Sequence, residues 1–405
     1  MKELAPGRIM VVDALRGFCL FGILLAHFAE AHAGGPTPGA DFNAFALVDK
    51  IAVILVTVLV VGKFFALFSF LFGLSFWLQM QGGSSSSQSF LPRYLRRLFI
   101  LLLIALVHQT FWMGDILIIY VPLAFVLLAF RRMPGRWLLI AGLCLVMNVP
   151  GRLYDVLNFL LLHQQQPDMM GSIAKPYEDI ILHGSLPDLW AFNWSTFPNK
   201  MHMQVFSGRL AQTLGFFLLG LYAGRQGWLT QAANYRPQLK AIRRRTGWIL
   251  LTCLLLAVGL LATNELAKMG WEQSPVMGFV FTLLIDAFNS SMVGWYVCVV
   301  ALLLTGQSWW QPRLAALSPV GKMALTAYLL QTVVGLALFF GFGAGLYQQT
   351  GSAVNMLLAF GFFILQVWLA RWWFQHYRFG PVEWLWRSGT AGRWQPWHIA
   401  QAKDA

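Results

Sequence analysis

The sequence predicts an all-α, polytopic membrane protein, and three observations support this fold class. Of the 405 residues, 58% are hydrophobic and 11% are charged, and the mean hydropathy is +0.61. Several apolar stretches are long enough to cross a bilayer as helices, and the lysines and arginines lie mostly in the short segments between them. We therefore expect a single transmembrane domain over residues 1–405 rather than a soluble domain around one core.

The apolar stretches predict a bundle of about ten transmembrane helices. They lie near residues 8–30, 60–80, 97–113, 115–131, 137–158, 207–224, 246–264, 276–305, 319–340 and 353–375. The apolar stretch 47–61 before the second helix is either a separate interfacial helix or a long tilted extension. Residues 1–7 and 31–33 also fit the charged start and the cleavage site of a signal peptide, which would make the first span removable.

The charges between the apolar stretches predict the topology. Basic residues alternate with segments that have few or none, such as 110–114 and 341–352. Because short cytoplasmic loops are rich in Lys and Arg, both termini are expected in the cytoplasm. The long loop 159–206 is then extracytoplasmic, and residues 376–405 form a cytoplasmic amphipathic tail. A loop of that length in a compact bundle is usually functional or disordered, and its aromatic residues favour a packed lid over a flexible tether.

Composition also argues against several classes of partner. The net charge of +13 lies in loops between apolar stretches, so it reports topology, and no nucleic-acid partner is expected. The four cysteines are isolated within predicted spans and show no metal-ligand spacing, so neither a metal site nor a disulfide is expected.

The first predicted span contains ionisable residues inside an apolar helix. A charge in hydrocarbon costs at least ~2.5 kcal/mol, so Asp13 and Arg16 should face protein, water or a substrate path. At about 100° per residue, Arg16 and His27 lie within roughly 20° of each other on the helix, with Asp13 beside them. This polar stripe either lines a functional passage or only locks the helix to its neighbours through an Asp13–Arg16 pair.

A histidine and an aspartate flank the turn between the third and fourth predicted spans, at the predicted outer surface. His108 ends one helix, and Asp115 begins the next. A carboxylate beside an imidazole can orient it and raise its basicity, as a general base requires. The alternative is that Asp115 only caps its helix and His108 only anchors at the interface. His27 is expected at the same outer level.

The ninth predicted span begins with Ser318 and Pro319, which look like an N-cap followed by proline at the first helical position, and Lys322 follows one turn later. Tyr328 and Gln331 extend polarity into that helix. A helix N-terminus beside a lysine suits a phosphate-bearing ligand, although an ordinary cytoplasmic helix start would look the same. In the tail, Glu383 and Arg387 have the spacing of an i,i+4 ion pair.

These segments together resemble the YeiB family of bacterial inner-membrane proteins. The matching stretches are VDALRGFCLFGILL, KFFALFSFLFG, RRLFILLLIALVHQTFWMGDILIIY, GKMALTAYLLQT and FGPVEWLWR, spread between residues 11 and 387. The family usually has Asn at the position of His27 and Asn-Tyr at Ala327-Tyr328, so no catalytic role for His27 follows from the resemblance. His108 and Asp115 match the family pattern. The resemblance implies location in the bacterial inner membrane.

The resemblance also suggests a reaction. The first-helix pattern is similar to that of transmembrane acyltransferases of the heparan N-acetyltransferase type, an analogy at the level of fold. On that analogy acyl-CoA is the expected donor, held near Asp13, Arg16, Lys322, Tyr328 and Gln331. His108, Asp115 and His27 are the expected catalytic residues.

The expected partners under this hypothesis are the lipid bilayer and a small-molecule or glycan acceptor outside; a homodimer is left open. The alternative hypothesis is a proton-coupled transporter or exporter of a small solute, in which Asp13, Arg16 and His27 line a path near the middle of the membrane. A scaffolding or sensory role, with the polar stripe used only for packing, is a third reading.

Overall fold

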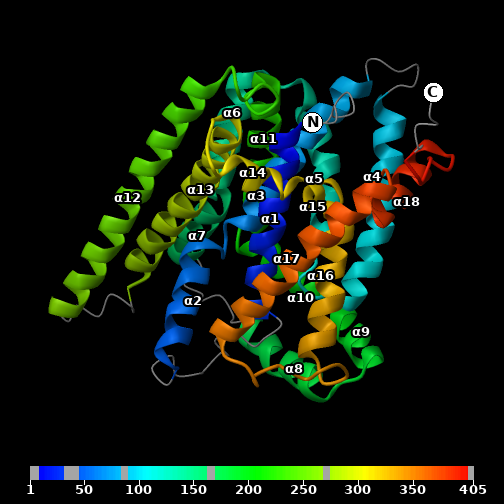
Figure 1. Ribbon diagram of the computed structural model, residues 1–405. Coiled ribbons are helices and arrows are strands. Elements are labelled where there is room, and N and C mark those ends of the chain that lie inside the picture. The colour runs from blue at the N-terminus through cyan, green and yellow to red at the C-terminus, as the bar shows by residue number, and fades with distance from the viewer. Residues whose placement is uncertain (1–8, 32–44, 84–89, 162–168, 268–273, 400–405) are drawn as a thin grey trace, which may run out of the picture.

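A computed structural model describes residues 9–31, 45–83, 90–161, 169–267 and 274–399, and these fold mainly as helices. Figure 1 shows one bundle with α1 (Met10–Ala26) in its middle. The described residues contain no strand, only an isolated bridge between Tyr377 and His398. The all-α prediction is confirmed for this part of the chain.

The remaining elements follow in order along the chain. The first half contains η1 (His27–Ala31), α2 (Leu47–Leu59), α3 (Phe64–Gly83), α4 (Phe90–Phe111), α5 (Leu117–Ala129), η3 (Phe130–Arg132), α6 (Gly135–Val146), α7 (Val149–Leu161), α8 (Met169–His183), α9 (Leu186–Ser195) and α10 (Phe197–Phe206). The second half contains α11 (Arg209–Gln226), α12 (Arg236–Ala267), α13 (Pro275–Thr305), α14 (Gln311–Ala315), α15 (Ser318–Lys322), α16 (Ala324–Phe339), α17 (Ser352–His376) and α18 (Pro381–Ala391).

The helices are those of a membrane protein. Within the described residues, five are long and apolar enough to cross a bilayer, or six if one bent pair is counted as a single span. The stretches predicted at 97–113, 115–131, 137–158 and 207–224 also form helices of the bundle, namely α4, α5, α6 with α7, and α11. The count of ten spans and the topology stay predictions.

The first helix is central to the bundle. Along α1, Leu15, Cys19, Leu20 and Leu24 are completely buried, and the helix ends in a short π-helical turn that begins at His27. Removal of this segment as a signal peptide would take out the centre of the core. Residues 1–7 and 32–33 of the signal-peptide alternative lie outside the described residues.

Several predicted spans are interrupted. The ninth ends at Lys322 as α15 and restarts at Ala324 as α16, and the two parts of this broken span meet at 84°. The N-cap position of α15 is Leu317, and no side chain makes a capping hydrogen bond to this helix. The prediction that Ser318 is the N-cap is therefore wrong, because Ser318 is already the first residue of the helix. The stretch at 47–61 is a separate helix, α2, joined to α3 by a turn in which Gly62 has a φ of 80°.

Two glycines allow the broken span to contact α1. A Cβ atom on Gly321 would lie 1.8 Å from the carbonyl oxygen of Asp13, and one on Gly17 would lie 2.2 Å from that of Leu317. Small residues allow helix backbones to approach closely within a membrane. This contact places the break in the ninth span next to the ionisable residues of α1.

The predicted extracytoplasmic loop is largely helical. Its described part forms α8, α9 and α10, which cover one end of the bundle, whereas α18 lies at the opposite end, near the start of α1 (Figure 1). Asn193 of α9 donates to the Thr110 carbonyl at 2.9 Å, and the Trp194 indole donates to the Thr110 hydroxyl at 3.1 Å. These contacts attach α9 to the end of α4.

Substitution of Gly321 by Ala should destabilise the protein. The new methyl group would force α1 and α15 apart, and overpacking of this kind costs about 1–3 kcal/mol. Gly259→Ala is the matched control, because a Cβ atom there would meet nothing within 4 Å. Thermal unfolding in detergent should show a lower midpoint for Gly321→Ala alone. Equal midpoints for the two variants would show that the α1–α15 contact is loose.

Candidate functional site

A cavity of about 410 Å³ lies between α1, α3, α4, α5, the broken span and α18. Its polar and ionisable lining residues are Asp13, Arg16, Ser75, Gln79, Tyr94, Arg97, Tyr120, Lys322, Tyr328, Glu383 and Arg387. The volume is within the range of about 300–1,000 Å³ that is typical of small-ligand pockets. The charged stripe of α1 therefore faces a void and not a sealed packing contact.

Asp13 and Arg16 form the ion pair that their spacing predicted. Arg16 Nη1 donates to Asp13 Oδ1 at 3.0 Å, and Arg16 Nη2 donates to the Ser75 hydroxyl at 2.6 Å. The Arg16 side chain remains 27% exposed. Asp13 Oδ2 is buried and has no hydrogen-bond partner among the described residues. Since buried polar atoms are normally satisfied, this oxygen is an exception among the described residues.

The cavity carries an excess of positive charge. Arg16, Arg97, Lys322 and Arg387 line it, against the carboxylates of Asp13 and Glu383. The Arg97 guanidinium lies 3.7 Å from the centre of a Trp386 ring, so α18 holds this cation in place by a cation–π contact. An anionic ligand is the natural complement of such a lining.

Glu383 has a structural role that the sequence did not reveal. Its carboxylate accepts hydrogen bonds from the backbone amides of Leu325 and Thr326, at 2.6 and 3.1 Å, and from the Thr326 hydroxyl at 2.5 Å. Burial raises the pKa of Glu383, although these hydrogen bonds act in the opposite direction. The carboxylate of Glu383 therefore occupies the N-terminus of α16, whereas the anion site was predicted at Ser318 and Lys322, the two ends of α15.

The other expectations around the broken span change accordingly. Arg387 lies over the ring of Phe379, 4.9 Å from its centre. Glu383 makes its hydrogen bonds to α16, so the predicted i,i+4 pair with Arg387 does not describe its main contacts.

Gln331 does not line the cavity. Its amide nitrogen donates to the carbonyl oxygen of Leu20 and to the side-chain oxygen of Gln366, and so ties α16 to α1 and α17.

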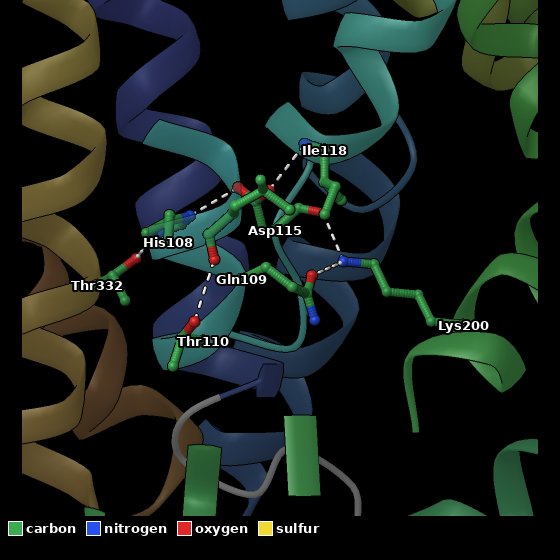
Figure 2. A network of polar contacts seen from close by, with 8 residues as sticks. His108, Gln109, Thr110, Asp115, Ile118, Lys200 and Thr332 are labelled. Carbon is green, nitrogen blue, oxygen red and sulfur yellow. Dashed lines mark hydrogen bonds and ion pairs between the residues drawn. The ribbon is translucent and has the colours of Figure 1, made fainter. Parts of the chain in front are cut away.

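His108 and Asp115 form the predicted pair at the end of α4. His108 Nδ1 lies 2.6 Å from Asp115 Oδ1, and His108 Nε2 lies 2.8 Å from the Thr332 hydroxyl (Figure 2). Because an ionised carboxylate only accepts, Nδ1 carries the proton, and in the neutral ring Nε2 accepts from Thr332. Asp115 Oδ2 also accepts from the Ile118 amide at 2.8 Å, so the carboxylate orients the imidazole and binds the first turn of α5 at once.

Lys200 was not predicted from the sequence. Its ammonium donates to the Gln109 side-chain oxygen at 2.5 Å and to the Asp115 carbonyl at 2.8 Å (Figure 2). Burial lowers the pKa of Lys200 to about 8, and the nearby Asp115 opposes the shift. Lys200 is a single lysine in an aromatic-rich segment, and nothing in the sequence of that segment indicates that it contacts the end of α4.

Tyr328 connects the two groups of residues. It lines the cavity, and its ring centre lies 4.9 Å from that of His108 and 6.4 Å from that of His27. His27 is also close to Trp112, at 5.2 Å between ring centres. His108, Asp115 and His27 do not line the cavity, so the structure brings them to its inner end but separates them from it by Tyr328. Within the described residues, no group of three His, Cys, Asp or Glu side chains could hold a metal ion.

Comparison with known proteins finds similar chains of nearly the same length. The family described as "Protein of unknown function (DUF418)" matches residues 223–393. The chain is similar to the uncharacterized protein YxaH of Bacillus subtilis (strain 168), with 29% identity over 96% of each chain, and to the uncharacterized protein YeiB of Escherichia coli (strain K12), with 28% identity over 95% of this chain and 96% of YeiB. These matches support the resemblance of the chain to the YeiB family. It is also 23% identical to an uncharacterized 39.9 kDa protein of Bacillus acidopullulyticus over 98% of both chains. No solved structure matches it.

The buried ammonium of Lys200 predicts a pH dependence of stability. Its pKa is about 8 in the folded protein, against the ordinary value of 10.5, so the folded state binds fewer protons between these values. The free energy of unfolding should therefore rise as the pH increases from 8 to 10.5, by on the order of 3 kcal/mol. Below pH 8 both states are protonated, and the penalty for burying the charge is constant.

Lys200→Gln should remove this rise, because glutamine has no charge to lose. Lys175→Gln, at an exposed position on α8, is the control for the other groups that titrate above pH 8. Thermal midpoints of the three proteins at pH 7, 8, 9 and 10 provide the measurement. The same pH profile in Lys200→Gln and Lys175→Gln would contradict the assignment.

Proposed function

We propose that this protein is an acyltransferase of the bacterial inner membrane that takes an acyl group from cytoplasmic acyl-CoA and transfers it to an acceptor outside. The observation that carries the proposal is the arrangement of a basic cavity and a histidine–carboxylate pair on the two sides of Tyr328. The cavity suits an anionic donor, and the pair suits deprotonation of a hydroxyl or amine.

The donor end of the proposed path is the basic lining. Arg16, Arg97 and Lys322 supply positive charge for phosphate groups, and the Arg16 side chain remains 27% exposed beside the void. Farther in, the lining includes Phe68, Phe72 and Leu117, which suit the less polar arm that carries a thioester. The acyl carbon would then approach Tyr328.

The acceptor end is the His108 group. His108 Nε2 takes the proton of the acceptor hydroxyl or amine while Asp115 holds Nδ1–H. The acceptor oxygen or nitrogen forms a bond to the acyl carbon, the thioester C–S bond breaks, and the thiolate leaves and takes up a proton to give free coenzyme A. In the structure the Thr332 hydroxyl is hydrogen-bonded to His108 Nε2, so the acceptor has to displace this hydroxyl before Nε2 can take its proton. Tyr328 has to move for the two ends to meet.

Coenzyme A binding and acyl transfer provide the direct test. Arg16→Gln should weaken binding of coenzyme A to the purified protein by about 10-fold or more, since a hydrogen bond to a charged group contributes about 1.5–3 kcal/mol. Lys322→Gln, which leaves the Asp13–Arg16 pair intact, should act in the same direction. Arg245→Gln removes an exposed charge outside the cavity and should bind normally.

His108→Gln should keep coenzyme A binding and lose about 10²–10⁴-fold in transfer, because it removes only the base. The proposal fails if the purified protein binds no coenzyme A. It also fails if His108→Gln supports the same cellular phenotype as the unchanged protein.

The broken span favours a transporter as the second candidate. Discontinuous helices often form the binding sites of secondary transporters, and here the 84° break lies beside Asp13 and Arg16 of α1. In this alternative the cavity is one of two access states, and a proton-coupled solute binds near the Asp13 carboxylate.

Access to Ser75 separates the two candidates. In a background with the native cysteines replaced, Ser75→Cys should react with a membrane-impermeant thiol reagent only from the side where α18 lies if the protein is a transferase whose donor cavity opens on that side and is separated from the acceptor end by Tyr328. A transporter should also allow reaction from the other side, and added solute should change the ratio of the two rates. Labelling in right-side-out and inverted vesicles gives the measurement. Labelling from both sides would contradict a transferase whose donor cavity opens on one side only.

A further inference from the structure

A second hollow lies far from the cavity, on the surface of the α12–α13 hairpin. It is an open groove of about 710 Å³, lined by Pro237, Lys240, Ala241, Arg243, Arg244, Gly247, Trp248, Leu251 and Trp295. All of these residues except Trp295 belong to α12, and most follow the three- and four-residue spacing of one helix face. The proposed acyl transfer makes no use of this groove.

The groove lies where a lipid would contact the protein. Helix α12 lies at the edge of the bundle (Figure 1). Only 6% of the apolar stretch within its residues 236–264 is buried. Lys240, Arg243 and Arg244 are exposed at its basic end, and Trp248, with 63% of its surface exposed, follows one turn later. Basic residues followed by tryptophan and then aliphatic residues are typical of the boundary between head groups and hydrocarbon.

The residues that line the groove include Lys240, Arg243 and Arg244 and no Asp or Glu. Asp286 of α13 does not line it and binds Arg152 and Gln212 instead. An anion is therefore the complementary ligand. Gly247 faces Trp295 across the groove: a Cβ atom there would make an ordinary contact with the ring at 3.8 Å, so a larger side chain would fill the space. The space beside Gly247 and Leu251 continues from the basic end toward the apolar surface, as an acyl chain would.

We propose that this groove binds the head group of an anionic phospholipid, with its phosphate at Lys240, Arg243 and Arg244 and an acyl chain along Gly247 and Leu251. Basic pockets between transmembrane helices at the cytoplasmic side are suited to such head groups. The loop charges predict the cytoplasmic side for this end of α12. The bound lipid fills the space between α12 and Trp295 and holds the hairpin at the bundle edge.

Lipid binding to the purified protein in nanodiscs tests the proposal. Phosphatidylglycerol should be retained through delipidation and exchange, whereas phosphatidylcholine with the same chains should be washed out. Replacement of Lys240, Arg243 and Arg244 by Gln together should lower retention of phosphatidylglycerol at least 10-fold. The matched control replaces Arg131, Arg132 and Arg136 by Gln, which removes three charges from another basic segment and should leave retention unchanged.

A second variant separates a shaped site from general attraction of positive charge to anionic lipid. Gly247→Leu keeps every charge and fills the groove, so it should lower retention of phosphatidylglycerol as the triple substitution does. Size-exclusion profiles confirm that each variant is folded. Three results would overturn the proposal: equal retention of the two lipids, normal retention in Gly247→Leu, or displacement of phosphatidylglycerol by millimolar inorganic phosphate, which would indicate a site for free anions.

Discussion

The close contact between α1 and α15 is the constraint on which the cavity depends. Gly17 and Gly321 allow the two backbones to meet, and the ninth span then turns through 84° before it continues as α16. The turn opens space beside α1, into which Asp13 and Arg16 project. Without that space, two ionised side chains would be surrounded by apolar helices, at a cost of several kcal/mol.

The break in the ninth span creates a second requirement, which the C-terminal tail meets. Restarting a helix inside a bundle exposes the amides of its first turn, and unsatisfied amides are costly away from water. Glu383 of α18 accepts two of them and the Thr326 hydroxyl. The tail is therefore part of the cavity wall, where Trp386 also holds Arg97.

The sequence predicted the parts of the site that depend on local geometry. Asp13 and Arg16 are one helical turn apart, and a short turn joins His108 to Asp115, so spacing alone brings each pair together. Comparison with relatives supports the resemblance and adds no activity, since the relatives are themselves described as uncharacterized.

Contacts across long sequence separations were not predictable. Lys200 reaches Asp115 over 85 residues, and Glu383 reaches Leu325 over 58. A lone lysine and a glutamate in an amphipathic tail have ordinary local explanations, so nothing in their own segments pointed to these partners. The break at Met323 was missed for the same reason: the hydropathy of 319–340 is continuous, and the turn arises from packing against α1.

Helix α16 connects the cavity to the histidine pair. Tyr328 and Thr332 are four residues apart and therefore lie on one face of α16, where the first lines the cavity and the second binds His108 Nε2. The start of the same helix is held by Glu383. A ligand that pulls on Lys322 or displaces Glu383 therefore acts on the helix that blocks the imidazole. Because Tyr328 and Thr332 belong to one helix, a shift of α16 would move both side chains together, so the proposed acyl transfer requires one displacement of α16 and not two separate ones.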